Sequence, residues 1–320
     1  MKLRIRPFLA PLAVVAAGIL YWRSHVMWAT PPAGAITPPI ARAPRDAAPQ
    51  IPKKRAASRD VTFFAVSDTH LGFVPEAREQ LVVDTMGAME GKAYPARVGG
   101  VVGKPRGLII TGDLTDSGEQ DEWNRFLYFW GSTPTTPSAA GLEIPVFEVI
   151  GNHDNGPGPW ISDRVAERHG GKPYAFDFDD VHFVALGEAP DDNALDWLER
   201  DLGRFEKDVP LIVYFHRALA GPWADNDWFD TGDYKGRIAK ILEGRCVAGI
   251  IHGHHHATDH YVWHGIDVYK PGALKHDAPT FAVMHIANET MSVAYYNYAE
   301  KDWIWSQTKN VCSSMNAAEH

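Results

Sequence analysis

The chain has 320 residues, of which 45% are hydrophobic and 22% are charged. These proportions are typical of a globular protein, and no segment repeats with the period of roughly 20–50 residues that marks a solenoid or propeller. Residues 1–60 carry 10 basic and 2 acidic side chains, so the remainder, with 21 basic and 38 acidic side chains, is strongly acidic. An acidic domain without a basic run repels polynucleotides, and we therefore expect no nucleic acid partner.

Residues 1–30 have the layout of an export signal or membrane anchor. Basic residues precede the apolar segment 8–22, and Arg23 ends it. The segment is short for a membrane span of ~20 residues, and the small-residue sequence 33–35 lies too far downstream to be assigned as a cleavage site. We expect an exported, extracytoplasmic or periplasmic domain that is either cleaved from this segment or tethered to the membrane by it.

Residues 31–59 are rich in Pro and Ala, which predicts an extended, semi-stiff linker. The linker carries the basic triplet 53–55 near its end, which either contacts anionic lipid or is a solvated run of charge. The folded domain is predicted over residues 60–298, with a C-terminal tail over 299–320.

Five apolar segments, each typical of a buried strand, run directly into residues that can bind metal ions. The segments are 63–66, 108–110, 146–150, 211–215 and 248–251. The polar residues that follow the five segments, in the same order, are Asp68 with His70, Asp113, Asn152 with His153, His216, and His254 with His256. Because the carboxyl ends of neighbouring strands in α/β sheets meet at one edge, we expect these side chains to converge. Mixed oxygen and imidazole ligands favour Fe, Mn, Zn or Co over Ca or Mg.

The remaining elements follow from apolar periodicity. Helices are predicted over 76–89, 119–130 and 191–205, with another beginning near Tyr234. A hairpin is predicted from 174–178 and 181–186, with His182 as a structural histidine. The first helix is expected to bury Leu81, Val82, Met86 and Met89 on one face. Strands near 261–264, 266–269, 281–285 and 291–296 are predicted to form an antiparallel region.

Two features leave alternatives open. Trp223 and Trp228 lie in a loop after His216, where they either select the substrate or cover an edge of the core. Cys246 and Cys312 are the two cysteines of the chain. In an oxidising compartment they could join the core to the C-terminal tail, or they stay unpaired.

The motifs, taken in order, resemble the signature of the calcineurin-like metallophosphoesterases. They are Asp68-x-His70, Gly112-Asp113-x-x-Asp116, Gly151-Asn152-His153-Asp154, His216 and Gly253-His254-x-His256. The resemblance covers roughly residues 60–298. It implies an α/β fold in which two sheets form an αββα sandwich, with helices outside and the metal centre at one edge of the sheets; periodicity alone indicates only mixed α/β.

The resemblance also implies two metal ions that share one carboxylate. The implied ligands are Asp68, His70 and His256 for the first ion, Asn152, His216 and His254 for the second, and Asp113 as the bridge. His153 would bind no metal, and would protonate the leaving oxygen or stabilise the transition state. Asp154 would hold the His153 ring in orientation, and Asp116 would brace the loop after Asp113.

The implied function is hydrolysis of a small phosphomonoester or phosphodiester by attack of a metal-bridging hydroxide. The alternative is a non-catalytic, metal-binding interaction module of the same fold, a change of role that is marked by loss of ligands. Every ligand position is filled here and His153 is present, which favours the enzyme. Lys270 stands where the family tends to carry Asn before Pro-Gly, so no substrate role is assigned to that turn. The sequence indicates neither the substrate nor the oligomeric state.

Overall fold

The computed structural model describes residues 59–158, 160–221, 233–275 and 279–313. By its internal contacts the chain divides into two units, 1–36 and 37–320, and all described residues belong to the second. The predicted signal or anchor, almost all of the linker, and Trp223 with Trp228 lie outside the described residues. Within those residues, no helix combines the length and apolarity needed to cross a membrane.

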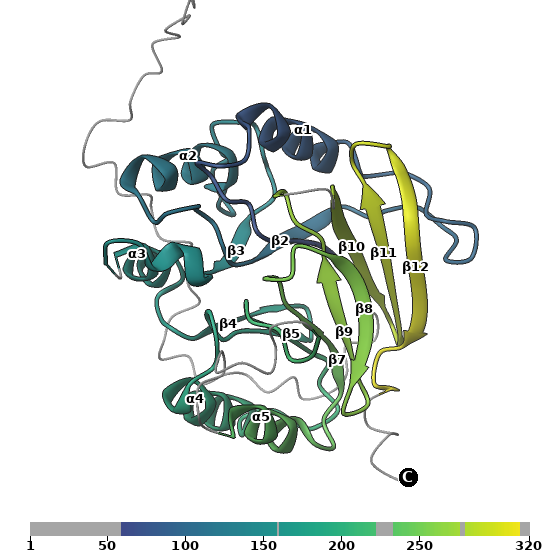
Figure 1. The fold of residues 1–320 in the computed structure, drawn as a ribbon. Coiled ribbons are helices and arrows are strands. Elements are labelled where there is room, and N and C mark those ends of the chain that lie inside the picture. The colour runs from purple at the N-terminus through teal and green to yellow at the C-terminus, as the bar shows by residue number, and fades with distance from the viewer. Residues whose placement is uncertain (1–58, 159, 222–232, 276–278, 314–320) are drawn as a thin grey trace, which may run out of the picture. The chain divides into compact units, whose positions relative to one another are not determined.

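Twelve strands form two mixed sheets of six strands each (Figure 1). The first sheet has the order β12-β11-β10-β1-β2-β3. Its strands are β1 (Asp60–Val66), β2 (Pro105–Thr111), β3 (Val146–Val149), β10 (Thr280–Ala287), β11 (Thr290–Asn297) and β12 (Asp302–Asn310). The second sheet has the order β4-β5-β6-β7-β9-β8. Its strands are β4 (Tyr174–Phe178), β5 (Val181–Ala185), β6 (Leu211–Tyr214), β7 (Val247–Ile251), β8 (Thr258–Trp263) and β9 (Ile266–Pro271).

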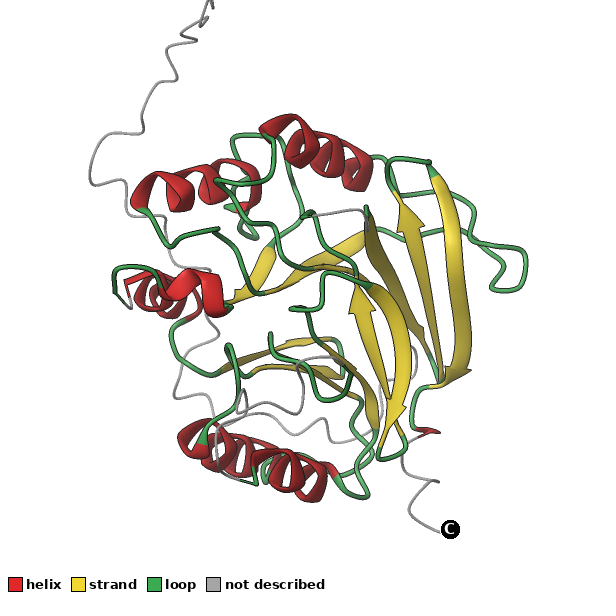
Figure 2. Cartoon of the chain, in the orientation of Figure 1, coloured by secondary structure: helices red, strands yellow, loops and turns green. Residues whose placement is uncertain are grey.

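Helices cover the outer faces of both sheets (Figure 2). The first sheet is covered by α1 (Glu76–Gly87), α2 (Gln120–Trp130) and α3 (Trp160–His169), and the second by α4 (Asp192–Leu202) and α5 (Tyr234–Leu242). Strand β1 is apolar without interruption because both of its faces are buried. Phe63 and Ala65 pack between the sheets, whereas Phe64 and Val66 pack against the helices. The predicted two-sheet αββα sandwich is therefore confirmed.

The region predicted to be antiparallel divides between the two sheets. Strands β8 and β9 join the second sheet, where β9 runs parallel to β7, whereas β10 and β11 join the first. Leu81 was expected in the core but is 38% exposed, because Val82, Val83 and Met86 form the buried face of α1. Helix α3 was not predicted, since its buried face includes the polar Arg168 and His169, which pair with Glu148 of β3.

The folded region continues beyond residue 298, where a tail was predicted. Strand β12 pairs with β11 along its length as the edge of the first sheet, and its alternating exposed residues give little apolar signal. Just after it, Cys312 forms a disulfide with Cys246, which precedes β7 of the second sheet. The open question about the two cysteines is thus answered by a bond that joins the two sheets.

Glu79 of α1 is a buried carboxyl group in the helical layer. Its Oε2 accepts a hydrogen bond from Trp130 Nε1–H of α2 at 2.8 Å. Burial raises the pKa of Glu79 well above its ordinary value, and the bond from Trp130 opposes this only in part. The folded protein therefore keeps Glu79 protonated at pH values where the unfolded chain ionises it.

We expect Glu79→Gln to increase the free energy of unfolding by an amount that grows as the pH rises from about 5 to 8. The unfolded glutamate ionises near pH ~4.3. Stability from the protonated folded form is complete below that value and is lost as the pH rises toward the folded pKa. Gln keeps an oxygen for Trp130 and does not titrate. Urea unfolding of wild type, Glu79→Gln and the control Glu76→Gln measures the effect, and a pH-independent difference would contradict it.

Candidate metal centre

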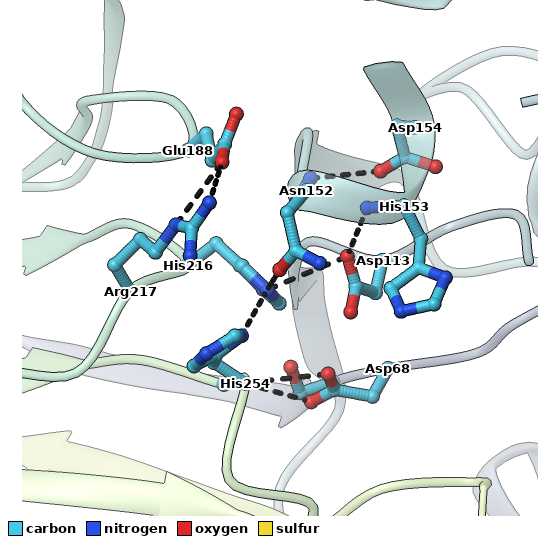
Figure 3. Close-up of polar contacts among 12 residues, drawn as sticks. Asp68, Asp113, Asn152, His153, Asp154, Glu188, His216, Arg217 and His254 are labelled. Atoms are coloured by element: carbon cyan, nitrogen blue, oxygen red, sulfur yellow. Dashed lines mark hydrogen bonds and ion pairs between the residues drawn. The ribbon is translucent and has the colours of Figure 1, made fainter. Parts of the chain in front are cut away.

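The predicted strand ends meet at one edge of the sandwich (Figure 3). Strands β1, β2 and β3 run parallel in the first sheet, as do β6 and β7 in the second, so their carboxyl ends point the same way within each sheet. The first sheet brings Asp68, His70, Asp113 and Asn152, and the second brings His216, His254 and His256. All seven predicted ligands therefore gather in one place.

The backbone is strained where the ligands stand. In the described chain nine non-glycine residues have positive φ, and five of them are predicted ligands, with φ between 43° and 70°. These five are Asp68, His70, Asp113, His254 and His256. A left-handed conformation is unfavourable for residues with a side chain and persists where the surrounding structure enforces it, most often at functional sites. Glycine would remove the strain but would also remove the ligand.

Gly253 lets the loop after β7 approach the loop after β1. A Cβ atom at Gly253 would lie 1.8 Å from Ser67 Oγ and 2.8 Å from Asp68 Oδ2. The close approach allows the backbone N–H of His254 to donate to Asp68 Oδ2 at 3.1 Å. The second sheet is thereby fixed directly against a carboxylate of the first.

One group of ligand atoms surrounds Oδ2 of Asp113. His70 Nε2 lies 3.4 Å from this oxygen and 3.2 Å from His256 Nε2. His256 Nε2 in turn lies 3.2 Å from Asp68 Oδ1. One atom from each of the four residues falls within 4.8 Å of the others. This is the composition predicted for the first ion together with the bridging carboxylate.

A second group surrounds the other oxygen of Asp113. His216 Nε2 lies 3.4 Å from Asp113 Oδ1, 3.1 Å from Asn152 Oδ1 and 3.1 Å from His254 Nδ1. Asp113 thus belongs to both groups, with one carboxylate oxygen facing each. The arrangement is that of two cation sites sharing one bridging residue.

The proton positions show that the second group fits a cation. His216 Nδ1 lies 2.8 Å from the carbonyl oxygen of Thr111, which can only accept, so Nδ1 carries a hydrogen. In the neutral ring Nε2 then presents a lone pair to oxygens of Asp113 and Asn152, and only a cation or a proton removes the repulsion. Burial acts to lower the pKa of His216, but the carboxylates of Asp113 and Asp68 outweigh it and raise the pKa. Metal ion and proton therefore compete for this nitrogen.

His254 is prepared as a neutral ligand. Burial lowers its pKa to about 3, and the neighbouring His216 adds to the effect. A neutral imidazole has a lone pair available for a metal at any physiological pH. The buried carboxylates Asp68 and Asp113 would supply negative charge to balance bound cations.

His153 stands beside the metal ligands and is itself partly exposed. Its ring meets the ring of His70 edge to face, with centroids 4.6 Å apart, and its backbone N–H donates to Asp113 Oδ1 at 2.9 Å. Its Nδ1 lies 2.7 Å from the carbonyl oxygen of Asp116 and therefore carries a hydrogen. Nε2 is the nitrogen left to exchange a proton with a substrate.

The structure corrects the predicted role of Asp154. Its carboxylate does not hold the His153 ring; it accepts hydrogen bonds from the backbone of Gly151, Leu114 and Thr115 and from the Thr115 hydroxyl, at 2.7–3.1 Å. Burial, reinforced by the nearby charge of Asp113, raises the pKa of Asp154 to about 7. Asp154 thus joins the loop after β3 to the loop after β2, and the Asp116 carbonyl orients the ring instead.

Two polar groups at the site were not predicted. Arg217 Nε donates to Glu188 Oε1 at 3.0 Å beside His216 (Figure 3). Asn155 Nδ2 donates to Glu188 Oε2 at 2.6 Å. Lys275 lies 2.9 Å from Asp116 Oδ1. No local motif distinguishes these charged residues from surface residues, because the fold alone brings them to the site. His182, by contrast, lies between Asp177 and Asp201 at 2.7 Å from each, as expected of a structural histidine.

The family is established by comparison with known proteins. Residues 61–258 match the model of the calcineurin-like phosphoesterases. The chain belongs to the calcineurin-like phosphoesterase family. The predicted family is thus confirmed.

Individual proteins resemble the chain in sequence or in fold. The chain is 26% identical over 175 residues to a probable cyclic nucleotide phosphodiesterase of Rhodococcus erythropolis, a match that covers 52% of this chain and 56% of that protein. Its fold resembles the purple acid phosphatase PPD1 of yellow lupin, with a TM-score of 0.54 at 12% identity over 79% of this chain and 54% of that one. It also resembles GAP50, the anchor in the inner membrane complex of Plasmodium, with a TM-score of 0.55 at 12% identity over 81% and 93%.

We expect the purified protein to bind close to two transition-metal ions per chain. Asp113→Asn should weaken both sites, because each receives one oxygen of this carboxylate, whereas His254→Ala should affect mainly the second. Metal analysis after dialysis measures the stoichiometry. His285→Ala is the control, because this residue pairs with Asp60 on the surface and lies outside both groups. A folded wild-type protein that retains no metal after loading would contradict the expectation.

Proposed function

We propose that the protein is a dinuclear-metal phosphoesterase that hydrolyses a phosphodiester, with cyclic nucleotides as the first class to test. One observation carries the proposal: the two groups of ligand atoms share Asp113, and His153 stands next to them with no hydrogen bond to its Nε2 from the described residues. A non-catalytic interaction module would not need both the two groups of ligand atoms and His153. The non-catalytic alternative is therefore the weaker one.

Each residue has a chemical task in this proposal. Two bound metal ions would activate water, neutralise phosphoryl oxygens and clamp an in-line geometry. Asn152 offers a neutral oxygen and so adds no charge that would repel the substrate. When the His153 ring carries hydrogens on both nitrogens, its Nδ1–H stays on the carbonyl of Asp116 and its Nε2–H passes to the leaving oxygen, which leaves the neutral ring.

The choice of a phosphodiester is supported by a relative. The Rhodococcus protein is named a probable cyclic nucleotide phosphodiesterase, and this chain matches just over half of its length. The likeness to a purple acid phosphatase supports the fold alone, since identity is 12%. A panel of cyclic nucleotides, acyclic phosphodiesters and phosphomonoesters, assayed with the metal-loaded protein, tests the choice. A preference for monoesters would overturn the substrate class, and no hydrolysis of any ester would overturn the function.

We expect His153→Ala to lower kcat by about 10²–10⁴-fold while leaving the metal content unchanged. The loss should be smaller for substrates with nitrophenolate as the leaving group, because an acidic phenol departs without a proton. Steady-state kinetics with good and poor leaving groups, together with metal analysis, measures both effects. Equal losses for the two leaving groups would instead indicate a contact to the phosphoryl oxygens.

We further propose that the domain is exported, with residues 1–30 as the signal or anchor. The disulfide between Cys246 and Cys312 supports this, because such bonds persist in oxidising compartments. A reporter fused after residue 60 should be active only when the signal directs export, and deletion of residues 1–30 should keep the protein inside the cell. Wild-type protein found entirely in the cytosol would contradict this.

A further inference from the structure

Lys275 reaches the metal centre from outside the residues that define the family. It follows β9 and lies beyond the matched region 61–258. Its Nζ lies 2.9 Å from Asp116 Oδ1, and its side chain is only 12% exposed. Its backbone N–H donates to the carbonyl oxygen of Asp68 at 3.3 Å, which fixes the start of the side chain beside the first group of ligands.

The exposed ring of Phe73 supports the lysine from another direction. Lys275 Nζ lies 4.7 Å from the centroid of this ring, a distance at which an ammonium group is attracted to an aromatic face. The ammonium is thus held between a carboxylate and an aromatic ring. These contacts to the backbone, to the carboxylate and to the ring fix the position of the Lys275 side chain.

Asp116 connects Lys275 to two functional histidines. Its Oδ1 lies 3.1 Å from His70 Nδ1, and its carbonyl oxygen accepts from His153 Nδ1 at 2.7 Å. Because Oδ1 accepts from Nδ1 of His70, Nε2 of that ring is the nitrogen that faces Asp113 and His256. A rotation of the Asp116 side chain would therefore release the ring of His70, a predicted metal ligand, and would move the carboxylate charge that lies 4.0 Å from His153 Nδ1.

We propose that Lys275 is a positioning residue that holds the Asp116 carboxylate and, through it, fixes the ring of His70. Lys275 Nζ and His70 Nδ1 both lie within hydrogen-bond distance of Asp116 Oδ1, and the two nitrogens lie 3.3 Å apart. Without the lysine, the carboxylate, which is 25% exposed, is free to turn toward water. Lys275 acts on the reaction through Asp116 and does not contact the phosphoryl group.

The test compares Lys275→Met and Lys275→Arg with wild type in two measurements. Titration of metal-free protein with Mn²⁺ or Zn²⁺ against a competing chelator should show one of the two ions binding about 10–100-fold more weakly in Lys275→Met, the usual effect of losing a partner of a ligand. With the metal-saturated protein, kcat should fall while KM stays near the wild-type value. Lys275→Arg should restore part of both, because it also donates to Asp116.

Lys270→Met is the matched control. Lys270 is also a buried lysine, 9% exposed, with Nζ 2.8 Å from the carboxylate of Asp259, but it contacts no residue of the metal centre in the described chain. It should keep wild-type metal affinity and kcat. A loss equal to that of Lys275→Met would show that removing any such lysine loosens the fold, and would overturn the inference.

A double-substitution cycle with Asp116→Asn tests the connection itself. If Lys275 acts through Asp116, adding Lys275→Met to Asp116→Asn should cost little more than Asp116→Asn alone; additive losses would overturn the inference. Unchanged metal affinity with a raised KM would instead assign Lys275 to substrate binding. The inference rests on the proposed function, but fails separately: a wild type that binds two metals and hydrolyses esters, with Lys275→Met indistinguishable from it, contradicts only the role of Lys275.

Discussion

The structure depends on bringing two carboxylates and four imidazoles to a single point inside a sandwich. Asp68 and Asp113 are buried, and their negative charge would be costly without cations beside them. The fold meets this constraint by ending five strands at the same edge, and five of the seven predicted ligands have left-handed backbone conformations there. Bound metal ions would offset the cost of burying the carboxylate charges.

The same constraint explains the residues around the ligands. Asp154 joins the loops after β2 and β3 through their backbone N–H groups, and Gly253 allows the loop after β7 to reach Asp68. Thr111 and Asp116 fix which nitrogen of His216 and of His70 faces inward. Each of these partners restricts the position or the orientation of one predicted ligand.

Most of the fold and the set of candidate ligands could be predicted from the sequence, because local sequence patterns indicate both. An apolar segment followed by Asp, Asn or His identifies a strand end and its ligand at once, and the order of the motifs does the rest. Helix α3 was not predicted, because its polar residues Arg168 and His169 face inward toward Glu148. Strand β12 was not predicted, because its many exposed side chains give no apolar pattern typical of a paired strand.

The roles of Asp154, Asp116 and Lys275 could not be read from the sequence for a different reason. The acceptor that orients His153 is a main-chain carbonyl, which every residue possesses. Lys275 comes from a loop more than 150 residues beyond Asp116, as the separation of 159 shows. Neighbouring position in the sequence made Asp154 the natural partner of His153, yet its side chain turns to the backbone of another loop.

Two links between the sheets, a disulfide and an ion pair, lie at the opposite end of the strands from the candidate metal centre. Cys246 precedes β7, whereas His254 and His256 follow it, and Arg59 before β1 pairs with Asp180 of the second sheet. The two sheets are therefore joined at the end of the strands away from the predicted ligands. Because these ligands come from both sheets, a small change in the angle between the sheets at that end would become a larger change in the distances between ligand atoms at the other end. The geometry of the metal centre thus depends on residues that take no part in the chemistry.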